Sequence, residues 1–492
     1  MRIPVARFTP TVMAAFLAVG CESTHSPVPS VTSSADVPSA SAAALATPSL
    51  VPRATTSPTV SQTLAPARPP APASAKLPIV RSALEIEADV LMAPGPSGTL
   101  LVSIPTSTGS VLALLDRDGS PRPGWPMAMD ESCPILWPLE DGSVRVVCRP
   151  LIFEAAEDVR AFAFDADGHP LAGWPVTIGD RVNIAGRMVG DDLVLAVGRF
   201  DGVPKVSMQM VATDGTVRQG ADVATECCEV WSVAPDGIAY ASWGDAESSN
   251  DSHITSIGPS GGQAGWPVHL SGRVSAPAPA PNGRIAVTVG SDTRDSGRVL
   301  VFERGGIGVA ATSGDLPLSV VFPPGSGDSD CGPGWIPMAP IVGEDGTIFV
   351  WSELEKTVVA LDPSLEIRRG WPFEPSNPLQ VRVYQDPRAE LSCGSFARPA
   401  VGPDSTLYLP IQARSEVVGG SVVAVGTNGR LRSGWPVELK KSGAEFWSVA
   451  VGSDGTVFAL VIEPESSRTS SATILAIAPD SSVRYATTVI EP

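Results

Sequence analysis

Two sequence markers alternate along residues 80–490, and their regular alternation restricts the fold more than any other feature of the chain. The first marker is a tight turn between two stretches of alternating apolar residues. Asp-Gly and Asn-Gly suit such turns because they adopt the positive φ that short hairpins need. The eight copies are Pro96-Ser97-Gly98, Asp141-Gly142, Asp191-Asp192, Asp236-Gly237, Asn282-Gly283, Asp345-Gly346, Asp404-Ser405 and Asp454-Gly455.

The second marker is an apolar strand and a turn followed by Gly-Trp-Pro. Its tryptophans are Trp125, Trp174, Trp266, Trp371 and Trp435. A sheet packed on both faces needs large apolar side chains between it and its neighbours, so we expect these residues to pack between sheets. The glycine permits a sharp bend, and the proline ends a strand without needing a ladder donor. An aromatic cage for a ligand is the alternative role.

The two markers alternate eight times, mostly with a period of about 45 to 50 residues. Each unit therefore holds two hairpins, or four short strands, which is the size of one propeller blade. We predict an all-β fold in which residues 78–492 form an eight-bladed β-propeller. Seven blades would follow if the first or last unit is incomplete.

The repeat resembles the quinoprotein-like, or PQQ-like, β-propeller repeat. The unit from Ala339 to Val350 has a Pro-led strand, the Asp345-Gly346 turn and an aromatic-aliphatic strand, and Val358-Val359-Ala360-Leu361-Asp362 closes the same blade. The resemblance implies a propeller fold. Because such propellers include dehydrogenases, assembly scaffolds and binding modules, the fold does not by itself select a function.

Residues 1–20 read as a secretion signal, with Arg2 and Arg7 before a short apolar run. The run ends in Ala18-Val19-Gly20-Cys21, which resembles a bacterial lipobox although Ala18 stands where that pattern usually has Leu. By this resemblance we expect lipidation at Cys21. We also expect an outer-membrane location, because Glu22 rather than Asp follows the cysteine. An ordinary signal peptide is the alternative. Residues 21–77 are rich in Ser, Pro, Ala and Thr and predict a disordered tether.

The net charge is −18, which argues against nucleic acid as a partner because counterion release needs clustered Lys and Arg. The four histidines are scattered and no CxxC occurs, so we predict no metal site and no cofactor. Six cysteines remain after Cys21, which suggests disulfides in an exported chain. They are Cys133, Cys148, Cys227, Cys228, Cys331 and Cys393.

The positions of the cysteines suggest pairings without fixing them. Cys133 and Cys148 flank the Asp141-Gly142 turn almost symmetrically, which favours a disulfide across that hairpin. Cys331 and Cys393 precede the turns of consecutive units at similar distances and could pair across two long insertions. Cys227 and Cys228 are adjacent, and they either bond each other or bond elsewhere.

The long insertions, 311–335 and 376–396, are candidate binding loops, because long connections on a rigid scaffold often carry function. Their polar residues are Asp328, Asp330, Arg382, Tyr384 and Arg388. Loops pinned by disulfides and without a ligand are the alternative.

These features predict a lipid-anchored propeller of the bacterial cell envelope that is a monomer and not an enzyme. We expect it to act as a scaffold for an envelope protein or glycan, and to contact the membrane only through its lipid. Two alternatives remain. A PQQ-dependent quinoprotein dehydrogenase is suggested by Cys227-Cys228, since such enzymes resemble this chain in having a vicinal disulfide. A carbohydrate-binding or carbohydrate-cleaving propeller is the other, although only four tyrosines and four histidines are present to serve as acid or base.

Overall fold

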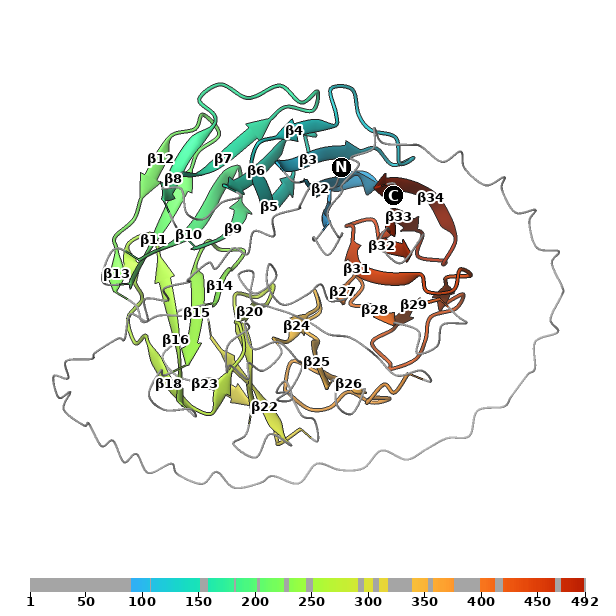
Figure 1. Cartoon of the computed structure of the whole chain (residues 1–492). Coiled ribbons are helices and arrows are strands. Elements are labelled where there is room, and N and C mark those ends of the chain that lie inside the picture. Colours follow the sequence, from blue (N-terminus) through green and yellow to red (C-terminus); the bar gives the residue numbers. More distant parts are fainter. Residues whose placement is uncertain are drawn as a thin grey trace, which may run out of the picture. The chain divides into compact units, whose positions relative to one another are not determined.

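A computed structural model describes residues 90–492 except 107, 151–157, 181–182, 201–203, 225–229, 245–250, 291–295, 304–308, 317–338, 353–356, 376–398, 412–418, 465–469 and 491–492. All described residues belong to one unit, Pro69–Pro492. This unit is an eight-bladed β-propeller, which confirms the predicted fold class. Figure 1 shows the sheets following one another round a ring in chain order. No helix long and apolar enough to cross a membrane occurs in the described part of the chain.

The first four blades are antiparallel sheets built on four consecutive strand positions, and short extra strands join some of them: β13 pairs with β11 in blade 3, and β18 pairs with β16 in blade 4. Blade 1 has β1 (Leu91–Pro94), β2 (Leu100–Thr106), β3 (Gly109–Leu115) and β4 (Met127–Met129), with the 3-10 turn η1 (Pro96–Gly98) between β1 and β2. Blade 2 has β5 (Ser132–Pro138), β6 (Val144–Arg149), β7 (Asp158–Phe164) and β8 (Val176–Asp180). Blade 3 has β9 (Asn183–Val189), β10 (Asp192–Phe200), β11 (Pro204–Val211), β12 (Val217–Gln219) and β13 (Val223–Ala224). Blade 4 has β14 (Val230–Val233), β15 (Ala239–Gly244), β16 (Asp251–Gly258), β17 (Gly261–Gly262) and β18 (Val268–Ser271).

The last four blades follow the same plan. Blade 5 has β19 (Arg273–Val274), β20 (Ala278–Pro279), β21 (Ile285–Gly290), β22 (Gly297–Phe302) and β23 (Val309–Thr312). Blade 6 has β24 (Ile341–Val342), β25 (Ile348–Ser352) and β26 (Thr357–Leu361). Blade 7 has β27 (Ala400–Val401), β28 (Leu407–Ile411), β29 (Ser421–Val425) and β30 (Val437–Glu438). Blade 8 has β31 (Glu445–Val451), β32 (Val457–Pro464), β33 (Ser470–Ile477) and β34 (Val483–Ile490).

Blade 6 departs from the predicted four strands. Within the described residues it has three strands, and isolated bridges from Val358 to Phe373 and from Leu361 to Ile367 mark the fourth position. The turn of blade 3 also differs slightly from prediction: Val189 pairs with Asp192, so Gly190-Asp191 forms the turn. The other predicted turns are in place, and Gly142, Gly237, Gly346 and Gly455 have φ between 75° and 82°.

The aspartates of these turns have a local role in forming them. In blade 2, Asp141 Oδ1 accepts a hydrogen bond from the backbone N–H of Ser143 at 2.8 Å. The same bond recurs from Thr347 to Asp345 and from Thr456 to Asp454, both at 2.9 Å. Asp side chains bind their own backbone two residues on, which favours a turn over a continuing strand.

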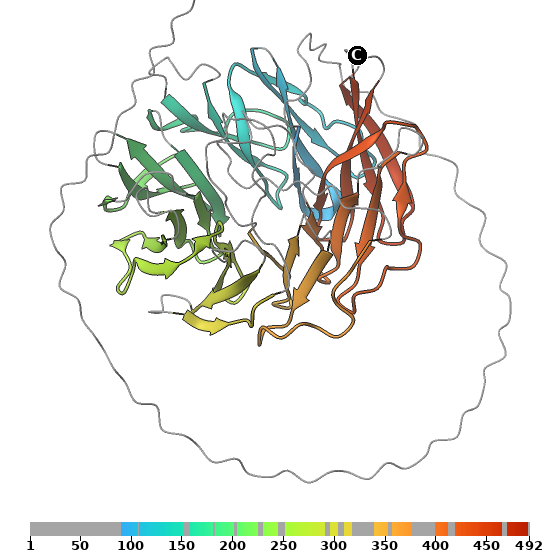
Figure 2. The same ribbon diagram turned by 60° about the horizontal axis from the view of Figure 1, so that its bottom comes forward.

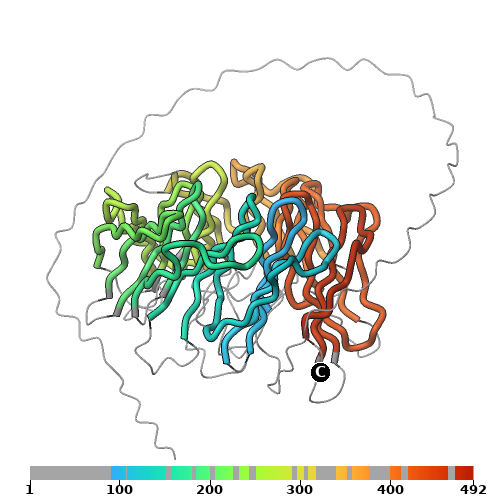
Figure 3. Tube along the Cα trace, turned by 90° about the horizontal axis from the view of Figure 1, so that it is seen from above, coloured from blue at the N-terminus to red at the C-terminus, as the bar shows by residue number. Residues whose placement is uncertain are grey.

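Because the strands of a blade alternate in direction, the turns between strands one and two and between strands three and four lie on the same face of the ring. We call this the turn face; Gly142 and Gly168 mark it in blade 2. The edge-on view in Figure 3 shows such turns along one side of the ring. The opposite face carries the connections between blades and the turns between strands two and three.

The core consists of apolar layers between adjacent blades. In the layer between blades 1 and 8, Leu100 and Val102 pack with Phe458 and Leu460, and all four are at most 3% exposed. Figures 1 and 2 both show the red last blade beside the blue first one. Each of these two blades takes its four strands from one end of the chain, so the ring closes by packing without exchanging a strand.

Candidate functional site

The tryptophans of the Gly-Trp-Pro motif lie between neighbouring blades. Trp125 of blade 1 is 6% exposed, and its Nε1 donates to the carbonyl oxygen of Ala166 in blade 2 at 3.1 Å. The equivalent bonds run from Trp174 to Thr213, from Trp371 to Thr427 and from Trp435 to Pro479, at 3.0–3.3 Å. Trp266 is half-buried and packs on Tyr240 and Phe302 with ring centroids 6.0 and 5.5 Å away.

The glycine of the motif is required by close approach of the next blade. A Cβ built on Gly124 would lie 1.7 Å from the carbonyl oxygen of Asp167, and one on Gly173 would lie 2.0 Å from that of Asp214. Both glycines also have φ near +80°, a region that residues with a Cβ rarely adopt. The motif thus joins the outer part of each blade that carries it to the following blade. The Trp-Pro peptide bond of all five motifs is cis.

On the turn face, arginines join the outer and inner halves of a blade. In blade 6, Arg368 Nη1 lies 3.1 Å from Asp345 Oδ2 and also donates to Thr347. Blades 7 and 8 repeat the arrangement with Arg432, Asp404 and Thr406, and with Arg484, Asp454 and Thr456. In each of these Arg–Asp–Thr triads the Asp and Thr belong to the turn before the second strand. Arg368 and Arg432 follow the third strand, whereas Arg484 lies in the fourth strand, β34.

These contacts lower the pKa of the aspartates. Burial alone would raise the pKa of Asp345, but hydrogen bonds from Thr347 and Ser405 and the nearby charge of Arg368 outweigh it and lower the pKa to about 2. For Asp404 and Asp454, burial likewise opposes the shift, and hydrogen bonds together with Arg432 or Arg484 lower the pKa. The triads therefore carry fixed charge pairs at neutral pH.

The turn face of blade 7 holds an open depression of about 330 Å³. Its lining residues are Asp404, Thr406, Gly426, Thr427, Asn428, Arg430, Leu431 and Arg432. Arg432 is paired with Asp404, whereas Arg430 is exposed, so the lining carries a net charge of about +1. Guanidinium, amide and hydroxyl groups of this kind suit a carboxylate or a polyhydroxylated group. The positive depression is notable in a chain whose net charge is −18.

A second, more enclosed cavity of about 220 Å³ lies on the turn face between blades 5 and 6. Ala286, Val301, Val342 and Ile348 supply apolar walls. The rim is polar and contains Asn282, Arg284, Glu344 and Asp345.

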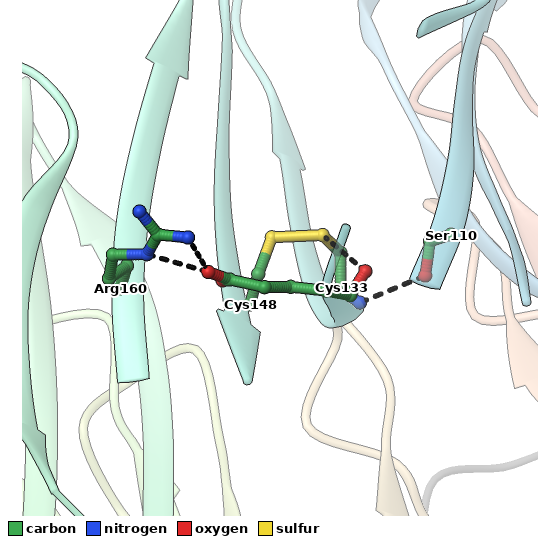
Figure 4. The surroundings of a disulfide bond; sticks show 5 residues. Ser110, Cys133, Cys148 and Arg160 are labelled. Atoms are coloured by element: carbon green, nitrogen blue, oxygen red, sulfur yellow. Dashed lines mark hydrogen bonds and ion pairs between the residues drawn. A yellow bond between two sulfur atoms is a disulfide. The ribbon is translucent and has the colours of Figure 1, made fainter. Parts of the chain in front are cut away.

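On blade 2 a disulfide joins Cys133 and Cys148, which confirms the predicted bridge across the Asp141-Gly142 hairpin. Both residues are at most 1% exposed. Figure 4 shows Ser110 and Arg160 on either side of this bridge, where Ser110 Oγ accepts from the Cys133 N–H at 3.1 Å. Arg160 Nε donates to the buried carboxylate of Glu131 at 2.6 Å. The bridge spans an irregularity in β5 between Ser132 and Ile135, where β5 and β6 lose their regular register.

Most other predicted site residues lie outside the described residues. These are Cys21, Cys227, Cys228, Cys331, Cys393, Asp328, Asp330, Arg382, Tyr384 and Arg388. The vicinal pair that suggested a quinoprotein is therefore untested, as is the pairing of Cys331 with Cys393. Among the described residues, no three His, Cys, Asp or Glu side chains gather as a metal-binding group would require.

Sequence reasoning missed the arginine triads and both cavities. A local signal for some triads existed, because Arg122, Arg368 and Arg432 each stand two residues before the glycine of a Gly-Trp-Pro motif. Arg368 and Arg432 form triads, whereas Arg122 pairs with Asp116 instead, at 2.6 Å. The cavities had no such signal, because they depend on which side chains two different blades bring together.

No family model matches the sequence, and no curated protein matches it either. Solved structures of β-propeller proteins are similar to it in fold. The periplasmic gluconolactonase of Pseudomonas aeruginosa is 17% identical with a TM-score of 0.40, and the match covers 69% of this chain and 94% of that one. Virginiamycin B lyase from Staphylococcus aureus is 11% identical with a TM-score of 0.35, over 66% and 89% of the two chains. A eukaryotic initiation factor is 10% identical with a TM-score of 0.43, over 80% and 97%.

These comparisons correct our prediction that the chain is not an enzyme. Chains of similar fold include a lyase and a gluconolactonase, so a propeller of this kind gives no reason to exclude catalysis. At such low identities the similarity describes the fold alone and assigns no reaction to this chain. The PQQ-like character of the repeat stays a prediction. What the comparisons and the structure establish together is a β-propeller fold.

Proposed function

We propose that this protein is a lipid-anchored envelope protein whose propeller binds an acidic group of an envelope protein or glycan through the turn face of blade 7. The observation that carries the binding site is the positively charged depression around Arg430 and Arg432. Its volume of about 330 Å³ falls at the lower end of the usual range for ligand sites. The lipobox-like Cys21 and the Ser/Pro/Ala-rich segment 21–77 support a tethered body that can reach a partner away from the membrane.

The chemistry of the depression favours a carboxylate-bearing partner. Arg430 is exposed and presents a planar group of five N–H donors, which matches a carboxylate in two-point contact. Thr427 and Asn428 add polar groups of the same turn. Asp404 does not oppose the ligand strongly because Arg432 neutralises it. A uronic acid of a glycan and an acidic side chain of a protein share this recognition chemistry.

Charge reversal at Arg430 tests the site. The tagged full-length chain with Arg430→Glu should lose most of its capture of partners from envelope extract, because the depression then carries a net charge of about −1. Arg117→Glu is the matched control, since Arg117 is also exposed and also lies on a turn between strands three and four, in blade 1. Glycan arrays rich in uronic acids separate a glycan from a protein partner. Equal capture by wild type and Arg430→Glu would refute this site.

A separate experiment tests the anchor. Wild type should incorporate a palmitate analogue during growth, and Cys21→Ser should not, because only the Cys thiol accepts the lipid. Equal labelling of both chains would contradict lipidation at this position. Binding by the turn face and anchoring by Cys21 are independent, so each result is informative alone.

A further inference from the structure

We call the interface between two adjacent blades a seam. The eight seams are packed with different side chains. Five seams receive a tryptophan from a Gly-Trp-Pro motif, but blades 3, 5 and 8 have no such motif. Between blades 3 and 4, Met208 is 1% exposed and the half-buried Met210 packs beside it. Between blades 8 and 1, Tyr485 is 2% exposed and lies against Gly119. Within the described residues, the seam between blades 5 and 6 has neither filling, and it contains the 220 Å³ cavity.

The cavity corresponds in register to part of the tryptophan pocket of another seam. In the seam between blades 1 and 2, Trp125 packs in one cluster with Leu101, Leu114 and Val144. In blade 1, Leu101 pairs with Leu114, and in blade 5, Ala286 pairs with Val301. Each pair lies one residue from the end of strands two and three that reaches the turn face.

Val144 begins the second strand of blade 2, as Ile348 does in blade 6. Ala286, Val301 and Ile348 all line the cavity. Two features account for the space: no tryptophan among the described residues enters this seam, and Ala286 stands where blade 1 has Leu101.

The outer part of this seam is closed by different side chains. Leu365 has φ of 68° and stands in a turn where blades 1, 2, 3 and 7 have glycine. It is 4% exposed and packs in one cluster with Leu316 of blade 5. In seams that have the motif, a glycine contacts this turn closely, as Gly370 does with Asn428 of blade 7. The leucines therefore seal the rim of the seam while the cavity opens on the turn face.

The rim of the cavity carries an excess of negative charge. Arg284 is paired with Glu303, and Asp345 is paired with Arg368. The exposed carboxylate of Glu344 adds one further negative charge at the mouth. An apolar interior with a small number of polar groups at the mouth is the usual anatomy of a small-molecule site. An apolar cavity of about 150 Å³ already accepts benzene, so this one has room for a larger ring.

We propose that the seam between blades 5 and 6 binds a small aromatic amine. Its ring takes the place that a tryptophan side chain takes in five other seams, and its ammonium group lies near Glu344. The site is separate from the depression in blade 7, and it does not depend on the lipid anchor.

Three probes of matched shape test the ligand class by calorimetry on the full-length chain. Indole should bind, tryptamine should bind about five-fold more tightly, and indole-3-acetate should bind more weakly than indole because of Glu344. Glu344→Gln should remove the preference for tryptamine and leave indole binding unchanged. Glu366→Gln, an exposed neighbour that does not line the cavity, should change neither.

Filling the cavity tests its location. Ala286→Leu should weaken indole and tryptamine at least ten-fold, because it restores the leucine that blade 1 has at this position. Val342→Met fills the space from the other blade and keeps the test valid if the first variant folds poorly; circular dichroism monitors folding of both. Retained binding in a folded filled variant, or no binding of indole and tryptamine to wild type at millimolar concentration, would overturn the proposal.

Discussion

Thr487 donates its hydroxyl to the carbonyl oxygen of Gly119 at 3.0 Å, across 368 residues of sequence. The bond joins β34, the outer strand of the last blade, to a turn of the first. It stands where four other seams have a tryptophan N–H bonded to the turn of the next blade. Thr487 is fully buried, so its hydroxyl has no access to water as an alternative partner.

Removing this hydroxyl should weaken ring closure. Thr487→Val keeps the shape and leaves the Gly119 carbonyl without its partner, so we expect a loss of about 1 to 2 kcal/mol in the free energy of unfolding. Urea denaturation followed by tryptophan fluorescence measures it. Thr177→Val, on the exposed side of β8, is the control and should change stability by about 0.5 kcal/mol at most. Equal stability of the two variants would contradict a role for the bond.

The glycine before each motif tryptophan should resist substitution. Gly124→Ala places a Cβ against the Asp167 carbonyl and forces an L side chain into φ of +79°, so we expect a loss of about 2 to 4 kcal/mol. Thermal unfolding reports it. Gly314→Ala is the matched control because its Cβ would meet nothing within 4 Å. A tolerated Gly124→Ala would mean that blades 1 and 2 do not approach as closely as described.

The Cys133–Cys148 disulfide should stabilise the hairpin of blade 2. It closes a loop with a sequence separation of 15, for which chain entropy predicts about 3 kcal/mol. The double variant Cys133→Ser/Cys148→Ser should therefore unfold at lower denaturant. Since both cysteines are buried, the wild type should also resist a reductant until it unfolds. Thiol labelling and mass spectrometry measure how fast the bridge is reduced. Rapid reduction in the folded protein would contradict this prediction.

Acid should destabilise the blades that carry arginine triads. The pKa of Asp345 in the folded chain is about 2, below its ordinary value of 3.8, so the unfolded chain takes up the proton first. The stabilisation is complete above the ordinary pKa and is lost as pH falls through the folded pKa. Unfolding free energies measured from about pH 5 to about pH 2 should fall less steeply in Asp345→Asn. Asp222→Asn, exposed in blade 3, should follow wild type; identical curves for all three chains would contradict the prediction.

The sequence predicted those parts of the structure that depend on local chemistry. Asp141-Gly142 and its equivalents form turns through the bonds of a few consecutive residues, so their spacing revealed eight blades. The Cys133–Cys148 bridge was predictable for the same reason, because both residues flank one hairpin. Counting turns could not predict how Thr487 meets Gly119, since that contact depends on the ring having closed.

The candidate sites depend on longer-range relationships. The role of Arg430 emerges only when its turn is seen beside Asp404, which belongs to a different hairpin of the blade. The cavity between blades 5 and 6 depends on Ala286 of one blade and Ile348 of the next. Neither residue differs from an ordinary strand residue in sequence. The sequence does show that blade 5 lacks Gly-Trp-Pro. Only the register of the strands shows where this leaves space.

Because the ring closes without an exchanged strand, the chain can be rearranged in units of whole blades. Every blade is an uninterrupted stretch of sequence, so chain order and spatial order are the same all round the ring. A circular permutant whose ends lie between any two blades keeps all eight sheets whole. Recombination at the same boundaries can duplicate or delete a complete unit, and the new neighbours meet through a seam of the same kind as before.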